Sequence, residues 1–269
     1  MTPQPKNRPK LTYKSEDSAF TSSEKSQMLA MTENKDLNFT FIYWDIASVG
    51  STSRDILEYG KANYKNESPT DEGWNDGKVQ TAFSVLPILK ISGPNGKELF
   101  ISESEVIDTF LAERFGLLGN NPWEALTICS FYSNIHYLRE RCFSEVMVSN
   151  PKDRKAARDE FLSTTLRKFL EDHEFHLQEN GNNGHYVGNK LSLADIHLWN
   201  VVHFFKTVPW GSMVLDAFAE YEAVWNVKEN VEQLPELETW RSSALFGKYE
   251  ENSRAWYAKR GVPEDVKEV

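Results

Sequence analysis

The stretch VLPILKISGPNGKELFISESEVIDTFL, residues 85–111, carries two features that decide the fold. Pro87 stands in an apolar, strand-like run, although proline lacks an N–H and is tolerated in a sheet only at a strand's first residue or on an edge. Ser104 stands where an amphipathic helix is expected to begin. The residues between them predict two strands, PILKIS and ELFIS, joined by a GPNG turn into a hairpin.

Two interpretations of this stretch are open on physical grounds alone. In the first, Pro87 starts an edge strand and Ser104 caps a helix, with no further role. In the second, a cis bond between Leu86 and Pro87 turns the main chain of Leu86 away from the sheet, where it can pair with an extended, peptide-like ligand. The free N–H groups at the helix start by Ser104 would then bind a carboxylate of that ligand.

The composition limits the class of protein. The chain has 269 residues, 40% of them hydrophobic and 13% aromatic, which is enough for one large or two small domains. A net charge of −10 argues against nucleic-acid or anionic-membrane partners. We find no apolar run of about 18 residues and no signal peptide. Cys129 and Cys142 fall in one predicted helix, roughly 20 Å apart, too far to pair. We therefore expect a reduced, cytoplasmic protein.

The chain divides into three parts by composition. Residues 1–36 are polar and rich in Pro, Lys and Ser, which predicts a disordered tail, with a transit peptide as the alternative. Residues 37–119 read as a mixed domain: a strand at 39–44, a helix at 51–64, an irregular segment at 67–83, then the hairpin and the helix from Ser104. Residues 120–269 contain no strand pattern, and we predict helices at 123–148, 152–180, 192–208, 236–246 and 251–261.

The segment YVGNKLSLADIHLW, residues 186–199, carries the signature of a strongly started helix. Ser192 is the expected N-cap, and Asp195, three residues on, completes a capping box. Leu191 and Ile196 stand at the positions of a hydrophobic staple. Two pairs of histidines nearby, in 173–176 and 197–203, have no third ligand at a suitable spacing, so no metal site is expected.

These two segments together resemble the cytosolic glutathione S-transferase family. The hairpin with its Leu-Pro step and following Glu-Ser is similar to that family's glutathione-binding hairpin, and YVGNKLSLADIHLW resembles the start of its central C-terminal helix. The resemblance covers about residues 38–260. It implies an α/β plus all-α fold, with a thioredoxin-like N-terminal domain at 37–119 and an all-helical C-terminal domain at 120–269. It also implies glutathione as co-substrate, a homodimer and no metal.

Within the family, the sigma-like, tyrosine-using branch is the most similar, because FTFIYW (39–44) resembles the first strand, which leads to the catalytic tyrosine. The resemblance implies that Tyr43 activates the thiol. A free thiol with a pKa near 8.5 is mostly protonated at neutral pH, and a phenol O–H directed at the sulfur stabilises the thiolate. The resemblance further assigns glutathione binding to Trp74, Lys78, Val85, Leu86, Pro87, Glu103 and Ser104. In that assignment Trp74 and Lys78 hold the glycine carboxylate, and Glu103 and Ser104 hold the γ-glutamyl end.

The chain departs from the sigma pattern directly after Tyr43. Ala47 and Val49 stand where that branch usually carries two arginines. A serine within 48–53 (Ser48, Ser51 or Ser53) therefore remains an alternative thiol activator. The favoured function is conjugation of glutathione to small hydrophobic electrophiles, and the alternatives are a weakly active binding or structural protein and a glutathione-dependent isomerase or peroxidase. The candidate walls of the electrophile pocket are Phe131, Tyr132, His136, Tyr137 and Arg141, together with the aromatic residues near the C-terminus.

Overall fold

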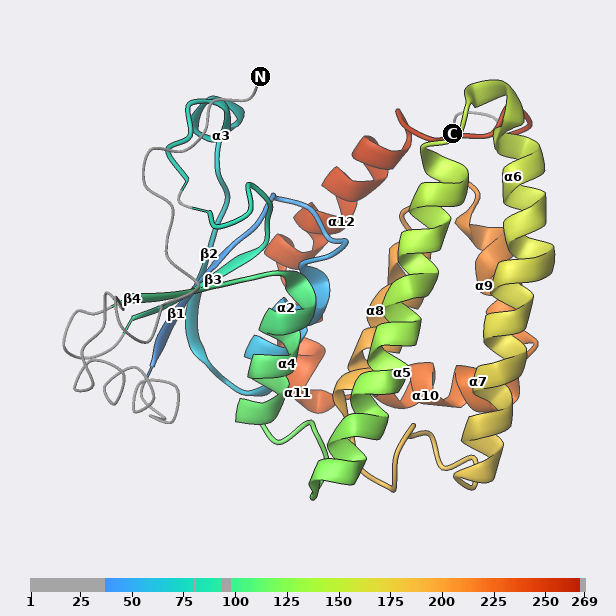
Figure 1. Cartoon of the computed structure of the whole chain (residues 1–269), viewed down its shortest axis with the longest axis horizontal. Helices are drawn as coiled ribbons and strands as arrows, with labels where there is room; N and C mark the ends of the chain where they lie inside the picture. The colour runs from blue at the N-terminus through green and yellow to red at the C-terminus, as the bar shows by residue number, and fades with distance from the viewer. Residues whose placement is uncertain (1–36, 80, 93–97, 267–269) are drawn as a thin grey trace, which may run out of the picture.

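The computed structural model describes residues 37–79, 81–92 and 98–266. In this part of the chain, a four-stranded sheet with two flanking helices lies beside a larger group of helices (Figure 1). The predicted disordered tail at 1–36 and the predicted GPNG turn lie outside the described residues. The mixed and all-helical parts expected from the resemblance are both present, with every described strand located between Asn38 and Ser102.

The sheet has the strand order β2-β1-β3-β4. β1 runs parallel to β2 and antiparallel to β3, and β3 and β4 form the predicted hairpin. Phe39 and Phe41 of β1 are buried because β1 lies inside the sheet and packs against the helices. This is the thioredoxin-like arrangement that the resemblance implies. The strands are β1 Asn38–Ile42, β2 Asn63–Glu67, β3 Ile88–Ser92 and β4 Glu98–Ser102.

The segment after β1 differs from the prediction. The helix predicted at 51–64 is too long, because α2 (Ser51–Tyr59) ends at Gly60 and the chain continues into β2. The ring of Phe115 packs so closely over Gly60 that a Cβ there would lie 2.4 Å from it, so this approach requires glycine. The segment predicted as irregular contains a short helix, α3 (Asp71–Asn75), capped by the Thr70 hydroxyl.

The helical part is built around α8, whose side chains are buried on nearly every side. α8 packs against α5 and α10, and also against α2 of the sheet-bearing part. Within the described residues, no helix combines the length and apolar character needed to cross a membrane. The other helices are α4 Ser104–Arg114, α5 Pro122–Arg141, α6 Arg154–Glu160, α7 Arg167–Glu179, α8 Leu193–Phe205, α9 Gly211–Ala219, α10 Glu222–Glu232, α11 Pro235–Arg241 and α12 Ala244–Tyr257. Two π-helical turns, η1 Cys142–Met147 and η3 Phe161–Leu166, and a short 3-10 turn, η2 Pro151–Asp153, lie between them.

The C-terminal helices also differ from the prediction. α9 and α10 occupy a region for which the sequence analysis predicts no helix, because α9 is apolar on several sides and lacks a side-chain cap. The helices predicted at 236–246 and 251–261 are divided at the wrong place. The break falls at Ser243, whose hydroxyl accepts the Phe246 N–H at 3.1 Å and starts α12.

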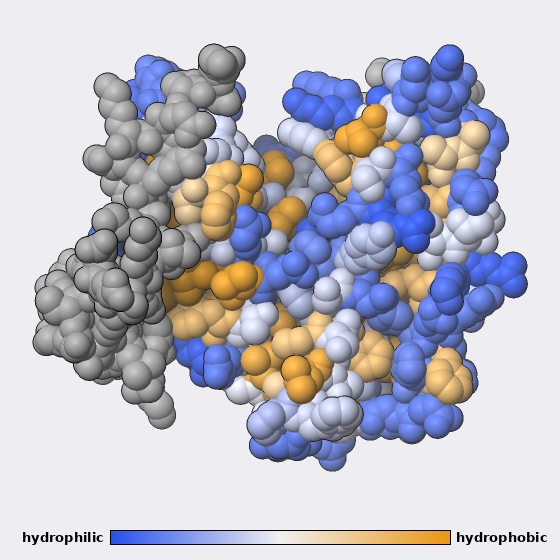
Figure 2. All heavy atoms as spheres, in the orientation of Figure 1, coloured by the Kyte–Doolittle hydropathy of each residue, from blue (hydrophilic) through white to orange (hydrophobic). Residues whose placement is uncertain are grey.

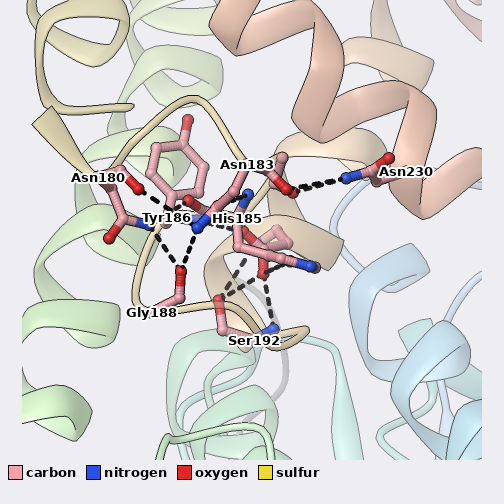
Figure 3. Close-up of polar contacts among 9 residues, drawn as sticks. Asn180, Asn183, His185, Tyr186, Gly188, Ser192 and Asn230 are labelled. Carbon is pink, nitrogen blue, oxygen red and sulfur yellow. Dashed lines mark hydrogen bonds and ion pairs between the residues drawn. The ribbon is translucent and has the colours of Figure 1, made fainter. Parts of the chain in front are cut away.

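The predicted capping box at the start of α8 is confirmed (Figure 3). The Asp195 carboxylate accepts the Ser192 N–H at 2.7 Å and the Tyr186 N–H at 2.8 Å. The preceding loop is held by Asn180, whose side-chain amide donates to the carbonyl groups of His185 and Gly188, both at 2.9 Å. Buried main-chain groups that would otherwise lack partners are thereby satisfied, which fixes the loop before the central helix.

We expect Asp195→Ala to lower the free energy of unfolding by about 3–5 kcal/mol, because it leaves two buried N–H groups without an acceptor. Urea unfolding followed by circular dichroism measures this. Asn121→Ala is the matched control: it removes an exposed cap that accepts two N–H groups at 3.0 Å, and should cost only about 1 kcal/mol. Equal losses in the two variants would contradict the prediction.

Candidate active site

A cleft of about 940 Å³ opens between the loop after β1 and the helices α5 and α12. In Figure 2 the molecule is hollowed between its sheet-bearing part and its helical part, with hydrophobic atoms inside the hollow and hydrophilic atoms around it. This volume is typical of a site for a small-molecule ligand. The lining residues are Tyr43, Trp44, Asp45, Ile46, Ser48, Val49, Asp71, Arg139, Glu140, Phe143, Phe204, Asn252, Ala255, Trp256, Tyr257, Lys259 and Arg260.

Tyr43 follows the last residue of β1, and its side chain is 6% exposed. Its ring packs so closely on Gly50 that a Cβ at that position would lie 2.6 Å from it. Burial raises the pKa of the Tyr43 hydroxyl, although the charges of Arg139 and Arg54 and hydrogen bonds with Ser48 and Val49 act in the opposite direction. The phenol therefore keeps its proton at neutral pH and can donate a hydrogen bond to an anion in the cleft.

The three serines that are alternative thiol activators have different environments. Ser48 lines the cleft with Tyr43, and its Oγ lies 3.0 Å from the Tyr257 hydroxyl. Ser53 is fully buried and donates its hydroxyl to the Asp108 carboxylate. Ser51 begins α2 and is not among the residues that line the large cleft. Of the three, only Ser48 shares the cleft with Tyr43.

The Leu86–Pro87 peptide bond is cis, as in the second of the two interpretations of this stretch. Among the described residues, the Leu86 N–H and C=O groups have no hydrogen-bond partner, so they are available to a ligand. The main chain of Val85 is engaged differently: its N–H and C=O both bond to the Thr81 hydroxyl, at 3.3 and 3.1 Å. Only Leu86 therefore offers a free main-chain edge at this point.

Glu103 and Ser104 lie at the start of α4. Glu103 has a backbone φ of 71°, a value that residues other than glycine rarely adopt, so its backbone is strained. Ser104 is the first residue of α4, where N–H groups of the first turn are free. A strained residue beside free N–H groups is typical of a ligand-binding position.

The remaining predicted glutathione contacts, Trp74 and Lys78, lie in and just after α3. The Trp74 ring meets the Trp44 ring edge-on, with centroids 5.5 Å apart, and Trp44 lines the cleft. The Lys78 ammonium group pairs with Asp76 at 2.9 Å and is largely exposed. Apart from Tyr43, the predicted glutathione contacts do not line the large cleft itself.

The role of Arg54 is missing from the predicted site. Its buried guanidinium donates to the carbonyl groups of Ile46 and Trp44, at 2.6 and 3.1 Å, and to the Asn66 side chain at 3.0 Å. It also lies 4.0 Å from the ring centroid of Tyr249 in α12. Arg54 thus holds the loop after Tyr43 in place and brings positive charge beneath it. The sequence feature that could have indicated this role is a single arginine among the apolar positions of the helix predicted at 51–64.

The electrophile walls predicted on α5 were chosen on the wrong face, because none of those five candidates lines the cleft. Arg139 and Glu140 of α5 line it instead. Among the predicted C-terminal aromatic residues, Trp256 and Tyr257 do line the cleft. Phe131 packs against Tyr186 instead, with ring centroids 4.7 Å apart. The hydrophobic pattern of α5 alone does not identify its cleft face, because the residues that α5 contributes to the cleft, Arg139 and Glu140, are charged.

A buried polar cluster lies behind the cleft, where α2, α4 and α5 meet. The Asp108 carboxyl group accepts a hydrogen bond from the Ser53 hydroxyl and another, at 2.9 Å, from the Tyr132 hydroxyl. Burial raises the pKa of Asp108 to about 7. Within the described residues, no group of three or more His, Cys, Asp or Glu side chains is arranged to hold a metal ion.

We expect Asp108 to make the protein less stable as pH rises. Its carboxyl group has a pKa of about 7 when folded, against an ordinary value of 3.8. Between pH 4 and 7 the folded state therefore holds a proton that the unfolded state has released, so stability falls through this window and levels off above it. The loss should reach about 2–4 kcal/mol.

Asp108→Asn, which cannot ionise, isolates this effect from other titrating groups. Urea unfolding of both proteins at pH 5 and pH 8 should show the variant gaining stability relative to the wild type as pH rises. Stability curves that stay parallel across this range would contradict the prediction.

Known proteins that are similar to this chain include glutathione S-transferases. A family model described as "Glutathione S-transferase, C-terminal domain" matches residues 136–244. The chain is 23% identical over 205 residues to glutathione S-transferase 1 of Ascaris suum, covering 75% of this chain and 94% of that protein. It is 24% identical over 205 residues to glutathione S-transferase S1 of Drosophila melanogaster, covering 76% of this chain and 77% of that protein.

Among solved structures, the fold is similar to a prostaglandin synthase D of Nilaparvata lugens. The TM-score is 0.66 and the identity 23%, over 77% of this chain and 98% of that chain. A sigma class glutathione transferase of Fasciola hepatica has a TM-score of 0.64 and 19% identity, over 79% of this chain and all of that one. At these identities the structural likeness establishes the fold.

Proposed function

We propose, from the premise that this chain belongs to the cytosolic glutathione S-transferase family, that it conjugates the thiolate of glutathione to small hydrophobic electrophiles in the cytoplasm. The observation that carries the proposal is the buried, protonated Tyr43 hydroxyl in a cleft whose other walls include the apolar side chains of Phe143 and Trp256. Both cysteines are free thiols, in keeping with a reducing compartment.

In the proposed reaction, Tyr43 donates its hydroxyl proton in a hydrogen bond to the glutathione sulfur. This bond stabilises the thiolate and lowers the pKa of the thiol, as in the sigma-like branch. The charges of Arg54 and Arg139 act on the same anion. They supply positive charge that the sequence lacks at Ala47 and Val49, where arginines usually stand. The departure from the sigma pattern is therefore compatible with catalysis.

We propose that glutathione lies along the edge of the residues at 37–119, with its sulfur at Tyr43. The free main chain of Leu86 would pair with the peptide backbone, and the start of α4 at Ser104 would bind the γ-glutamyl carboxylate. Lys78 and Trp74 would hold the glycine end, which requires Lys78 to leave its exposed pair with Asp76, at little cost. The helical residues at 120–269 then form the electrophile's side of the cleft.

Tyr43→Phe should raise the pKa of bound glutathione's thiol and lower turnover about 10²-fold, because one hydrogen-bond donor to the anion is lost. Difference ultraviolet absorbance of bound glutathione, titrated against pH, measures the thiolate directly. Ser48→Ala is the control for the loop and should leave the thiolate band near its wild-type pH.

The titration also separates the alternatives. A thiolate band that survives Tyr43→Phe and disappears in Ser48→Ala would assign activation to the serine. Glutathione binding without a thiolate band in the wild type would leave a weakly active binding protein.

We further propose that the protein is a homodimer. Several large apolar side chains are exposed on the loop before β3, on α4 and on the N-terminal half of α5, and hydrophobic atoms gather over this region (Figure 2). An exposed apolar patch of this kind marks an interaction surface, and a twofold axis would let a second copy cover it. The residues are Phe83, Val85, Val106, Trp123 and Leu126.

Leu126→Glu should therefore convert the dimer to a monomer, because it buries a charge in the contact. Light scattering coupled to gel filtration should give twice the chain mass of 31.0 kDa for the wild type and the chain mass for the variant. Met213→Glu, on α9 and 43% exposed, adds the same charge elsewhere and should remain dimeric. A monomeric wild type would overturn the proposal.

A further inference from the structure

The end of α12 brings positive charge to the mouth of the cleft. Lys259 and Arg260 both line it, and the Arg260 guanidinium lies 4.2 Å from the Trp256 ring centroid. Among the described residues, neither cation has a carboxylate within ion-pair distance. The chain as a whole carries 40 acidic against 30 basic residues, so two adjacent unpaired cations at a cleft stand out against its surface.

Two of the carboxylates that line the cleft are paired with other cations. Asp45 is paired with Lys248 at 2.5 Å, and Glu140 with Arg139 at 3.1 Å. Asp71 lines the cleft from the opposite part of the molecule, in α3. The positive charge at the mouth is therefore available to a ligand.

The apolar walls continue past these cations into a smaller cavity of about 250 Å³. Phe143, Trp256, Lys259 and Arg260 line both spaces, so the two are contiguous. Arg154 also lines the smaller cavity, and its Nε is buried and, within the described residues, has no hydrogen-bond partner. A buried N–H of this kind lacks an acceptor that a ligand could supply.

The segment that carries these cations is fixed to the helical part. Gly261 has φ = 69° and approaches η1 so closely that a Cβ would lie 2.7 Å from the Met147 Cα. Beyond it, the Asp265 carboxylate receives two hydrogen bonds of 2.8 Å from the Arg158 guanidinium of α6. The backbone that carries Lys259 and Arg260 is thus anchored directly after them, which lowers the entropy cost of binding there.

We propose that the electrophile is an elongated apolar molecule with a remote acidic group. Its reactive carbon lies at Tyr43, its apolar body packs between Phe143 and Trp256, and its carboxylate pairs with Lys259, Arg260 or Arg154. This inference rests on the proposed transferase function and adds the class of substrate. Lys259 and Arg260 follow the end of α12 and Arg154 begins α6, apart from the residues proposed to dock glutathione, so the two acidic molecules have separate cationic partners.

The test uses two matched probes, ethacrynic acid and its methyl ester. Both carry the same enone, to which the thiolate adds. The sulfur–carbon bond forms, the π electrons move toward the carbonyl oxygen, and the α-carbon takes up one proton from water, equal to the one that the thiol released. The probes differ only in the remote carboxylate, so a difference in KM reports that group.

We expect the full chain to have a KM for the acid about tenfold below that for the ester, rising with salt for the acid alone. The double variant Lys259→Gln, Arg260→Gln should raise the KM of the acid about tenfold and leave the ester within twofold. The matched control is Arg167→Gln, Lys168→Gln, which removes the same charge from the exposed face of α7 and should change neither.

The outcomes separate this inference from the function on which it rests. Turnover of the ester with no preference for the acid, or a double variant that affects both probes equally, would overturn the inference and leave the transferase standing. No glutathione-dependent turnover of either probe would overturn the proposed function and this inference with it.

Discussion

The buried guanidinium of Arg54 is the interaction on which the cleft depends. It reaches three acceptors and three aromatic rings, and these belong to β1 and the loop after it, to β2 and to α12. Such a loop would otherwise leave its carbonyl groups unsatisfied at the junction of the two parts. A planar group with five donors suits this task, and lysine could not replace it. The position of Tyr43 and the opening beside it follow from this anchor.

Hydrogen bonds between side chains join the sheet-bearing part to the helical part. Asp55 of α2 accepts hydrogen bonds from Trp240 at 3.0 Å, Arg241 at 2.8 Å and Asn200 at 3.1 Å. Thr52, one turn away, bonds to His197 of α8 at 2.8 Å. Directional bonds of this kind specify one orientation of the two parts, whereas apolar packing tolerates sliding. The width of the cleft is therefore defined by paired groups behind it.

Features encoded by neighbouring residues were predictable, and features made by distant ones were not. The cis bond before Pro87 and the capping box at Ser192 depend on residue types within a few positions. The strand β2 escaped prediction because its residues are mostly polar and it pairs on one side only. The individual residues of the wall facing Tyr43 could not be selected among the C-terminal aromatics, because Ser48 meets Tyr257 across 209 residues and no local pattern encodes that contact. The roles assigned to the glutathione contacts remain predictions.

The two sides of the cleft come from opposite ends of the chain, and this has an evolutionary consequence. Substitutions in α12 and in the segment clamped by Arg158 can reshape the acceptor side without touching Leu86, Ser104 or Tyr43. The range of molecules that are modified can drift while the chemistry stays constant. Arg54 sets the limit of this freedom, because its guanidinium both holds the loop after Tyr43 and contacts the Tyr249 ring of α12.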